Sequence, residues 1–240
     1  MPDYDARLVE LYDIDNPAGP DHDVVRTLAD ELGARSVLDV GCGTGLLTVS
    51  LVRPGRRVVG VDPSTTMLAY AARRSGGGAV TWVLGDSRAI PRGPFDLAVM
   101  SGNVAQHIPD PAWERTLSDI RAALREGGVL TFESRNPYAR AWTTWTGGGP
   151  TTRLTDHGLL REWMEVEEIG PGRVLLTAYN EFADTGELVI EHVTLEFRGR
   201  ELIEAQLAGA GFDVTHVWGD WSRTPFSRDA PLMVFEARGT

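Results

Sequence analysis

The sequence predicts an α/β fold in which a parallel sheet is covered by helices and an antiparallel β insertion follows. Between residues 21 and 135, short β-branched runs alternate with longer stretches of helical periodicity, the pattern of βαβ units. Between residues 138 and 199, strand-like stretches are joined by short turns that contain Gly, which is typical of antiparallel strands. A length of 240 residues fits one large domain, or one domain with an insertion.

Hydrophobic periodicity and capping residues define the elements of the first part of the chain. The helix expected over residues 21–32 carries apolar residues on one face and is followed by Gly33, a common helix stop. Ser64 is expected to cap a later helix, and Asp110 with Pro111 to begin another. In chain order we expect a helix at 21–32, a strand at 36–40, a helix at 43–52, a strand at 57–61, a helix after Ser64, strands at 80–84 and 95–101, a helix from Asp110 to Gly127-Gly128, and a strand at 129–133.

The pattern changes after Pro137. A short aromatic segment at 138–145 is followed by Gly147-Gly148-Gly149-Pro150, which is expected to form a loop or hinge. The chain then returns to its first pattern near its end. In this second part we expect antiparallel strands at 162–169, 174–182 and 188–197, then a helix at 201–208 and strands at 212–218 and 232–236.

Charge and cysteine content exclude several classes of function. The chain has 34 acidic and 23 basic residues, all of the latter Arg, and a net charge of −11, which disfavours nucleic acid and anionic membranes as partners. A single cysteine, Cys42, excludes an internal disulfide. No apolar run approaches the ~18 residues of a membrane helix. We therefore expect a cytoplasmic protein, a monomer or homodimer, that binds no nucleic acid, membrane or metal.

The most informative segment is a strand that runs into a glycine-rich turn and then a helix, over residues 37–46. Its G-x-G-x-G spacing differs from the G-x-G-x-x-G of dinucleotide enzymes. Asp62 and Asp86 each follow a later strand, and the carboxyl ends of parallel strands line one crevice. A carboxylate at Asp62 can accept both ribose hydroxyls of a nucleoside. Alternatively, the turn is only a tight connection, Asp62 favours the start of the next helix, and Asp86 is a turn residue.

These residues together resemble the class I S-adenosylmethionine-dependent methyltransferase family. The resemblance rests on Leu38-Asp39-Val40-Gly41-Cys42-Gly43-Thr44-Gly45, Asp62, Gly85-Asp86-Ser87, Phe95-Asp96-Leu97 and Leu124-Arg125-Glu126-Gly127-Gly128. It implies a Rossmann-like, seven-stranded, mostly parallel sheet flanked by helices, with the last strand antiparallel, the β insertion after the fifth strand, and S-adenosyl-L-methionine as cofactor. We expect a single domain over 1–240, with an N-terminal lid (1–20), a cofactor-binding core (21–137), an antiparallel substrate flap (138–199), and a C-terminal helix with the last two strands (200–240).

The resemblance also implies the cofactor-binding residues. The glycines of the turn would pass beneath the amino-acid part, Asp62 would bind the ribose, and Asp86 with Ser87 would lie at the adenine. Tyr12 resembles lid tyrosines that approach the methionine carboxylate. The full predicted set is Tyr12, Gly41, Cys42, Gly43, Gly45, Asp62, Pro63, Met67, Asp86, Ser87 and Ser101.

Acceptor chemistry is expected just past the fourth and fifth strands. His107 is the candidate general base for a hydroxyl acceptor, and the alternative is a structural His that fixes its loop. The predicted substrate-binding residues are Asn103, Gln106, Arg135, Trp142 and Trp145. Asn103 and Gln106 would orient the substrate or tie down their loop, and Arg135, like Arg161, would recognise an anionic group. Trp142 and Trp145, with Trp163 and Tyr179, would wall an apolar pocket or form the core of the flap.

The expected function is transfer of a methyl group from S-adenosylmethionine to an O or N atom of a small molecule. An amine acceptor needs only to be present as the free base, whereas a hydroxyl benefits from a general base. The sequence leaves O- and N-methylation open. Two alternatives are a non-methylating S-adenosylmethionine enzyme, by cyclisation or aminopropyl transfer, and a catalytically silent cofactor-binding protein.

Overall fold

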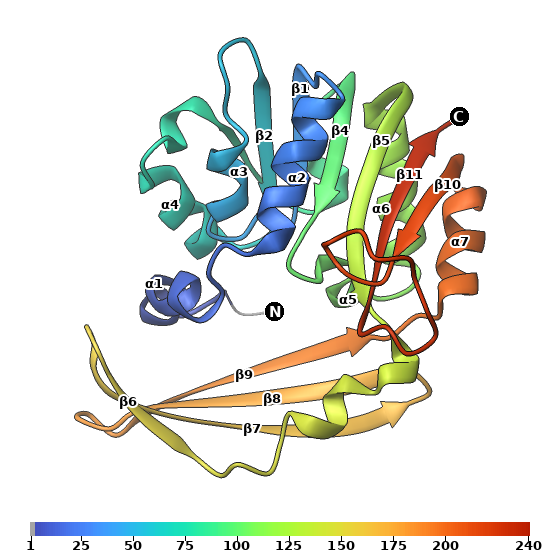
Figure 1. The fold of residues 1–240 in the computed structure, drawn as a ribbon. Helices are drawn as coiled ribbons and strands as arrows, with labels where there is room; N and C mark the ends of the chain where they lie inside the picture. Colours follow the sequence, from blue (N-terminus) through green and yellow to red (C-terminus); the bar gives the residue numbers. More distant parts are fainter. Residues whose placement is uncertain (1–2) are drawn as a thin grey trace.

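The computed structural model describes residues 3–240, which form a seven-stranded main sheet and a separate four-stranded sheet (Figure 1). The main sheet has the order β10-β11-β5-β4-β1-β2-β3. Strand β11 runs antiparallel to both of its neighbours, and the strands from β5 to β3 are parallel to one another. The predicted fold class is therefore confirmed. The strands are β1 (Ser36–Val40), β2 (Arg57–Asp62), β3 (Thr81–Leu84), β4 (Phe95–Met100), β5 (Leu124–Arg135), β10 (Phe212–Trp218) and β11 (Leu232–Gly239).

Helices cover both faces of the main sheet. Side chains alternate between the two faces along each strand, so neighbouring residues of a strand belong to apolar layers on opposite sides. Val37 of β1 packs with α2 and α3, whereas the next residue, Leu38, packs with α6 and α7. Both apolar layers are buried, so the strands are apolar on both faces as a parallel sheet requires. The helices are α2 (Pro20–Glu31), α3 (Leu46–Ser50), α4 (Thr65–Arg73), α5 (Val104–His107), α6 (Ala112–Ala123) and α7 (Arg200–Gly209).

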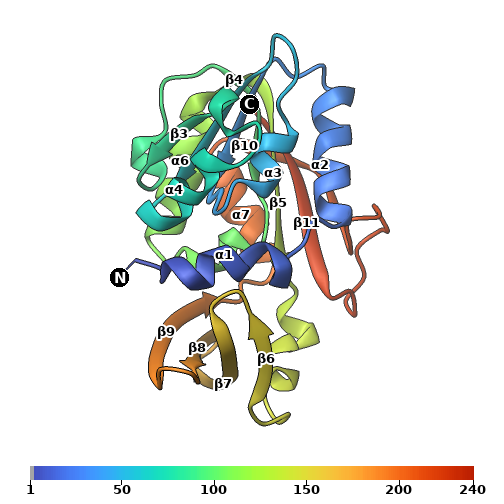
Figure 2. The ribbon, with the colours of Figure 1, turned by 90° about the vertical axis from the view of Figure 1, so that its left-hand side faces the viewer.

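The insertion after β5 is an antiparallel sheet that lies beyond the carboxyl ends of the parallel strands (Figures 1 and 2). Two short 3-10 helices, η3 (Pro137–Ala139) and η4 (Ala141–Thr144), connect β5 to it. Its strands are β6 (Thr151–Thr155), β7 (Gly158–Gly170), β8 (Arg173–Phe182) and β9 (Glu187–Glu196), in that order. No element was expected over β6, because its short polar sequence carries no clear strand pattern; it pairs only with β7.

Several element boundaries differ from those expected, and two of them have a clear structural reason. Helix α3 begins at Leu46 rather than residue 43, because the glycine-rich turn occupies the residues before it. Helix α6 ends at Ala123, and β5 begins at Leu124 and runs through Gly127-Gly128. The side chain of Arg125 donates to Asp96 of β4 at 2.7 Å, which fixes this early part of β5 beside the sheet.

Helix α1 (Ala6–Asp15) lies between the main sheet and the four-stranded sheet (Figure 2). Its apolar face is the reason: Leu11 is buried against Leu160 of β7 and Phe182 of β8. Helix α1 thus connects the two sheets at the edge where the parallel strands end.

Within residues 3–240, no helix is long and apolar enough to cross a membrane.

Candidate active site

The glycine-rich turn after β1 adopts a backbone that only glycine accepts readily. Gly41, Gly43 and Gly45 have φ values of +77°, +52° and +74°, in the left-handed region. A Cβ atom on Gly41 would lie 2.6 Å from the side chain of Val104, and one on Gly45 would lie 2.5 Å from that of Trp82. The turn is therefore closely packed as well as tight.

Asp62, the last residue of β2, holds this turn in place. Its Oδ2 accepts a hydrogen bond from the Gly43 backbone N–H at 2.8 Å, and its Oδ1 accepts one from Ser64 N–H at 2.9 Å. Burial raises the pKa of the carboxyl group. Ser64 caps α4 as expected, because its hydroxyl accepts the Met67 N–H at 3.0 Å. Each Asp62 oxygen retains a second lone pair, so ribose hydroxyls remain possible donors to it.

A cavity of about 270 Å³ opens at the carboxyl ends of β1 and β4. It is bounded by the glycine-rich turn, by the loop after β4, by the start of α2 and by α1. The structure brings to it seven of the predicted site residues: Tyr12, Gly41, Cys42, Gly43, Ser101, Asn103 and Arg135. Burial raises the pKa of the Cys42 thiol, so this cysteine is not a thiolate nucleophile at neutral pH.

A second hollow, of about 440 Å³, is lined by Pro63, the residue after Asp62, and by Asp86, whereas Asp62 itself lines neither hollow. The guanidinium of Arg88 pairs with Asp86 at 2.7 Å and is the main cause of the lowered pKa of that carboxyl. Asp86 also accepts the Arg88 backbone N–H at 3.0 Å, which is the turn hydrogen bond that the alternative interpretation predicts. Binding of adenine by Asp86 stays a prediction.

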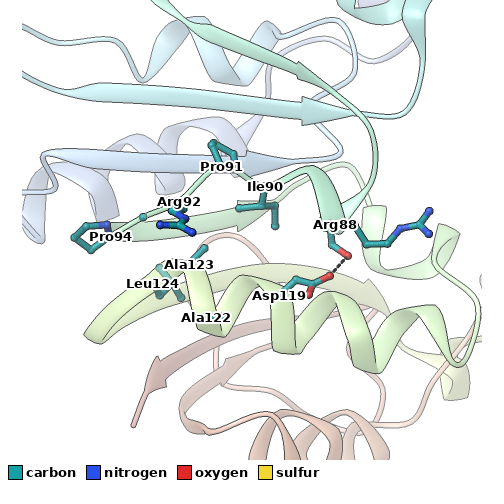
Figure 3. Close-up of a pocket in the computed structure, with 11 residues that line it drawn as sticks. Arg88, Ile90, Pro91, Arg92, Pro94, Asp119, Ala122, Ala123 and Leu124 are labelled. Atoms are coloured by element: carbon teal, nitrogen blue, oxygen red, sulfur yellow. Dashed lines mark hydrogen bonds between the residues drawn. The ribbon is translucent and has the colours of Figure 1, made fainter.

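Ser87 and Met67 are buried outside the 270 Å³ cavity. The Ser87 hydroxyl donates to Asp119 of α6 at 2.6 Å. Ser87 borders another hollow, of about 450 Å³, between α6 and the loop that follows β3; Figure 3 shows Ile90 on the loop and Ala123 on the side of α6. That hollow contains none of the residues of the glycine-rich turn, and the 270 Å³ cavity is the better candidate site.

His107 ends α5, a short helix that contacts both β5 and β9. His107 is exposed to solvent and does not line the 270 Å³ cavity, but neighbouring protein partly desolvates the ring and Arg135 adds positive charge nearby. These two effects, in that order, lower its pKa to about 4. The imidazole is therefore neutral at neutral pH, and it is a weak base.

The remaining predicted substrate residues divide into two groups. Gln106 is fully buried, and its Oε1 accepts from Nη1 of Arg135 at 3.0 Å. Arg135 also lies over the ring of Trp145, 5.0 Å from its centroid, so the three form one cluster beside the cavity. Trp142 instead packs edge-on against Phe197 at 4.4 Å within the flap core, which is the alternative considered for it.

Trp163 and Tyr179, which were expected either to wall a pocket or to form the core of the flap, stack on each other at 5.0 Å. They lie on the neighbouring strands β7 and β8. Their side chains are on one face of the four-stranded sheet, and Leu160 packs against α1 on the other face. Arg161 shares this outward face, where it pairs with Glu181 at 3.4 Å. Alternation along the strands places all three away from the main sheet.

Sequence analysis missed several polar residues at the site. Asp21 and His22 of α2 line the cavity, as does Asp39, whose pKa burial raises to about 7. Glu133 is buried behind the cavity, and burial raises its pKa to about 7 also. The sequence does mark Asp39 and Glu133, because each is an acidic residue within an otherwise apolar strand. No comparable signal marked His22, because its position on the cavity depends on how α2 meets the sheet.

Comparisons with known proteins agree with this geometry. Residues 37–128 match the methyltransferase domain family. Glycine N-methyltransferase from Oryctolagus cuniculus is 34% identical over a match that covers 43% of this chain and only 42% of that protein. A S-adenosylmethionine-dependent methyltransferase from Clostridium acetobutylicum has a TM-score of 0.80 and 19% identity, with 96% of this chain and 97% of that one covered.

An amino pentose methyltransferase from Micromonospora echinaspora, solved with bound S-adenosylmethionine, has a TM-score of 0.69 and 20% identity, with both chains covered completely. These structural likenesses extend over the flap as well as the main sheet. At such identities they establish the fold, and the residues of the site have to carry any statement about the reaction.

Proposed function

We propose that this chain, which belongs to the class I S-adenosylmethionine-dependent methyltransferase family, transfers the methyl group to an amine nitrogen of a small-molecule acceptor. The observation that carries the proposal is the glycine-rich turn on the 270 Å³ cavity, which is held by the hydrogen bond from Gly43 to Asp62, with a second hollow at the next residue, Pro63, and at Asp86. A nucleoside with an amino-acid extension needs such an arrangement.

The residues present fit this cofactor. Gly41 to Gly43 leave backbone open to the 270 Å³ cavity, and the free lone pairs of Asp62 suit ribose hydroxyls. When bound, the cofactor would supply a methyl group on a sulfonium: the acceptor nitrogen would bond to the methyl carbon in line as the carbon–sulfur bond breaks, and S-adenosylhomocysteine would leave. The protein has to align the acceptor and exclude water, and an amine that arrives as the free base needs no obligatory catalytic side chain.

The state of His107 favours nitrogen over oxygen as the acceptor atom. A base with a pKa of about 4 gains little by removing a hydroxyl proton, because general-base catalysis is efficient when the pKa of the base is near the working pH. The neutral ring still accepts a hydrogen bond from an amine N–H. One relative points the same way, because its name, glycine N-methyltransferase, states methylation at nitrogen.

On the acceptor side we assign Arg135, Gln106 and Trp145, with Asn103, to substrate binding. The guanidinium of Arg135 lies where it can pair with an anionic group on the acceptor, because it lines the cavity and is held by Gln106. In this proposal the four-stranded sheet closes over the acceptor and α1 closes over the cofactor.

The test uses methyl-labelled S-adenosylmethionine with two matched pairs of acceptors: glycine with glycolate, and an amino pentose with the corresponding pentose. We expect label on at least one amine and on neither hydroxyl compound, with release of S-adenosylhomocysteine. His107→Ala should keep at least about a tenth of the turnover, because no proton transfer to His107 is needed. Labelling of a hydroxyl compound, together with a fall in turnover of about 100-fold or more in His107→Ala, would contradict N-methylation. Release of methylthioadenosine would identify aminopropyl transfer instead.

A further inference from the structure

Helix α5 is a single turn that needs support from the rest of the chain. It spans only Val104–His107, and the residue before it, Asn103, has a φ of +60°. The last carbonyl groups of a helix have no partner within the helix, and one isolated turn is unfavourable on its own. Hydrogen-bond donors from elsewhere in the chain are therefore needed to hold α5 in place.

Arg198 provides these donors. Its Nη1 donates to the carbonyl oxygen of Ala105 at 3.0 Å, and its Nη2 donates to that of Ile108 at 2.6 Å and to Oδ1 of Asp110 at 3.1 Å. The guanidinium also lies over the ring of Trp113, 5.1 Å from its centroid. Arg198 is only 6% exposed, so these contacts are shielded from water and hold the planar group in one orientation.

These contacts reach Arg135 through α5. The peptide group between Ala105 and Gln106 is fixed at both ends, because Arg198 donates to its carbonyl and its N–H donates to the Asn103 carbonyl at 3.0 Å. The side chain of Gln106 then accepts from Arg135 at 3.0 Å. One peptide group and one side chain therefore separate Arg198 from Arg135, which lines the 270 Å³ cavity.

The residue before Arg198 supports Arg135 from another direction. Phe197 packs against Trp145 with ring centroids 6.1 Å apart, and the Arg135 guanidinium lies over the Trp145 ring. Phe197 and Arg198 directly follow β9, the last strand of the flap, and lead to α7. The point where the chain leaves the flap thus contacts both supports of Arg135.

We propose that Arg198 is a positioning residue for the acceptor side of the site: through α5 and Gln106 it holds Arg135 in the geometry that binds the acceptor, and it links the flap to that geometry. This rests on the proposed function, because it takes Arg135 as a group that binds the acceptor. If Arg198 contributed to stability alone, its loss would weaken the binding of cofactor and acceptor alike.

The test replaces Arg198 by Met, which keeps an apolar stem over Trp113 and removes all donors, and by Lys, which keeps the charge but lacks the planar fork. Arg200→Met is the matched control, because the Arg200 side chain is 39% exposed and pairs with Glu204 of its own helix. Each protein is titrated with S-adenosylhomocysteine and assayed with methyl-labelled S-adenosylmethionine and whichever of glycine and the amino pentose accepts the label.

We expect the KM of the amine to rise about 10-fold or more in Arg198→Met and less in Arg198→Lys, while the Kd of S-adenosylhomocysteine changes less than about threefold. In an Arg135→Met background, Arg198→Met should raise the KM by less than about a further threefold, because substitutions that act through one residue are not additive. An unchanged KM, an equal weakening of both ligands, or additive effects of the two substitutions would overturn the proposal.

A second measurement needs no acceptor. His107 is the last residue of α5, and desolvation with the nearby Arg135 lowers its pKa to about 4. Titration by NMR should give a pKa closer to the ordinary 6.5 in Arg198→Met, because a displaced α5 is better solvated, and no change in Arg200→Met. The same pKa in all three proteins would overturn the proposal. If the wild type methylates neither amine, the proposed function fails, and this titration decides separately whether Arg198 holds α5.

Discussion

Glu133 is an acid enclosed near the end of β5, and only 3% of it is exposed. One carboxylate oxygen accepts the backbone N–H of Asn103, while the other, Oε2, has no partner. Asn103 needs that support because its φ is +60°, a conformation that non-glycine residues rarely adopt. At the scale of single residues, the Glu133 carboxyl group supports the turn that carries Asn103 to the cavity through this hydrogen bond, while burial disfavours its charged form.

This arrangement predicts how stability depends on pH. Burial raises the pKa of Glu133 from its ordinary 4.5 to about 7, so the folded protein keeps a proton that the unfolded chain has released. Stability is therefore lost as pH rises through that window. Glu133→Gln keeps the acceptor for Asn103 and removes the charge. The variant should be more stable than wild type at pH 8 by about 1 to 3 kcal/mol, measured by urea unfolding.

The difference should disappear near pH 5, where the wild-type carboxyl is protonated in the folded state. Glu126→Gln, at an exposed position in the same strand, is the control and should have no such pH dependence. An equal loss of stability in Glu133→Gln at both pH values would show that the buried charge has no cost.

Residues whose neighbours are close in sequence were the predictable ones. The glycine-rich turn and Asp62 meet as their spacing indicated, because consecutive parallel strands end at the same edge. Trp142 was ambiguous because its partner, Phe197, lies on the far side of the flap in sequence. The cofactor and substrate roles of individual residues remain predictions.

At the scale of elements, α1 is held on both sides by ion pairs. Asp13 pairs with Arg74 of α4, and both side chains are 17% exposed. Asp15 pairs with Arg153 of β6, where the side chains are 42% and 32% exposed. A partly buried pair of charges contributes more than an exposed pair, so the contact with the main sheet should dominate.

Arg74→Gln should therefore loosen α1 more than Arg153→Gln does. Amide hydrogen exchange of residues 6–15 should become about tenfold faster in Arg74→Gln, for a loss of about 1.4 kcal/mol, and change little in Arg153→Gln. The core strands β1 and β4 should keep their protection in both variants. Equal exchange in the two variants would mean that α1 is held by its apolar contacts alone.

Long periodic elements were predicted well, and boundaries set by tertiary contacts were not. The parallel strands and α2 follow from apolar patterns that need no knowledge of distant residues. By contrast, β6 is a strand only because β7 pairs with it. The early start of β5 likewise depends on Arg125 reaching Asp96 on a neighbouring strand.

At the scale of the whole molecule, the site lies where the main sheet, α1 and the antiparallel sheet meet (Figure 1). The main sheet contributes the glycine-rich turn and Asp62. Helix α1 contributes Tyr12, and the antiparallel sheet follows, after η3 and η4, the strand that ends at Arg135. This arrangement separates a cofactor side from an acceptor side, and the central claim is that the cofactor side binds S-adenosylmethionine.

Isothermal titration of the wild type and Asp62→Ala with S-adenosylhomocysteine and with NAD tests that claim most directly. We expect micromolar binding of S-adenosylhomocysteine alone, weakened about 10- to 100-fold in Asp62→Ala through the loss of hydrogen bonds to its carboxylate. Asp156→Ala, in the turn between β6 and β7, is the control and should bind as the wild type does. Binding of NAD but not S-adenosylhomocysteine, or equal affinity in Asp62→Ala, would contradict the account.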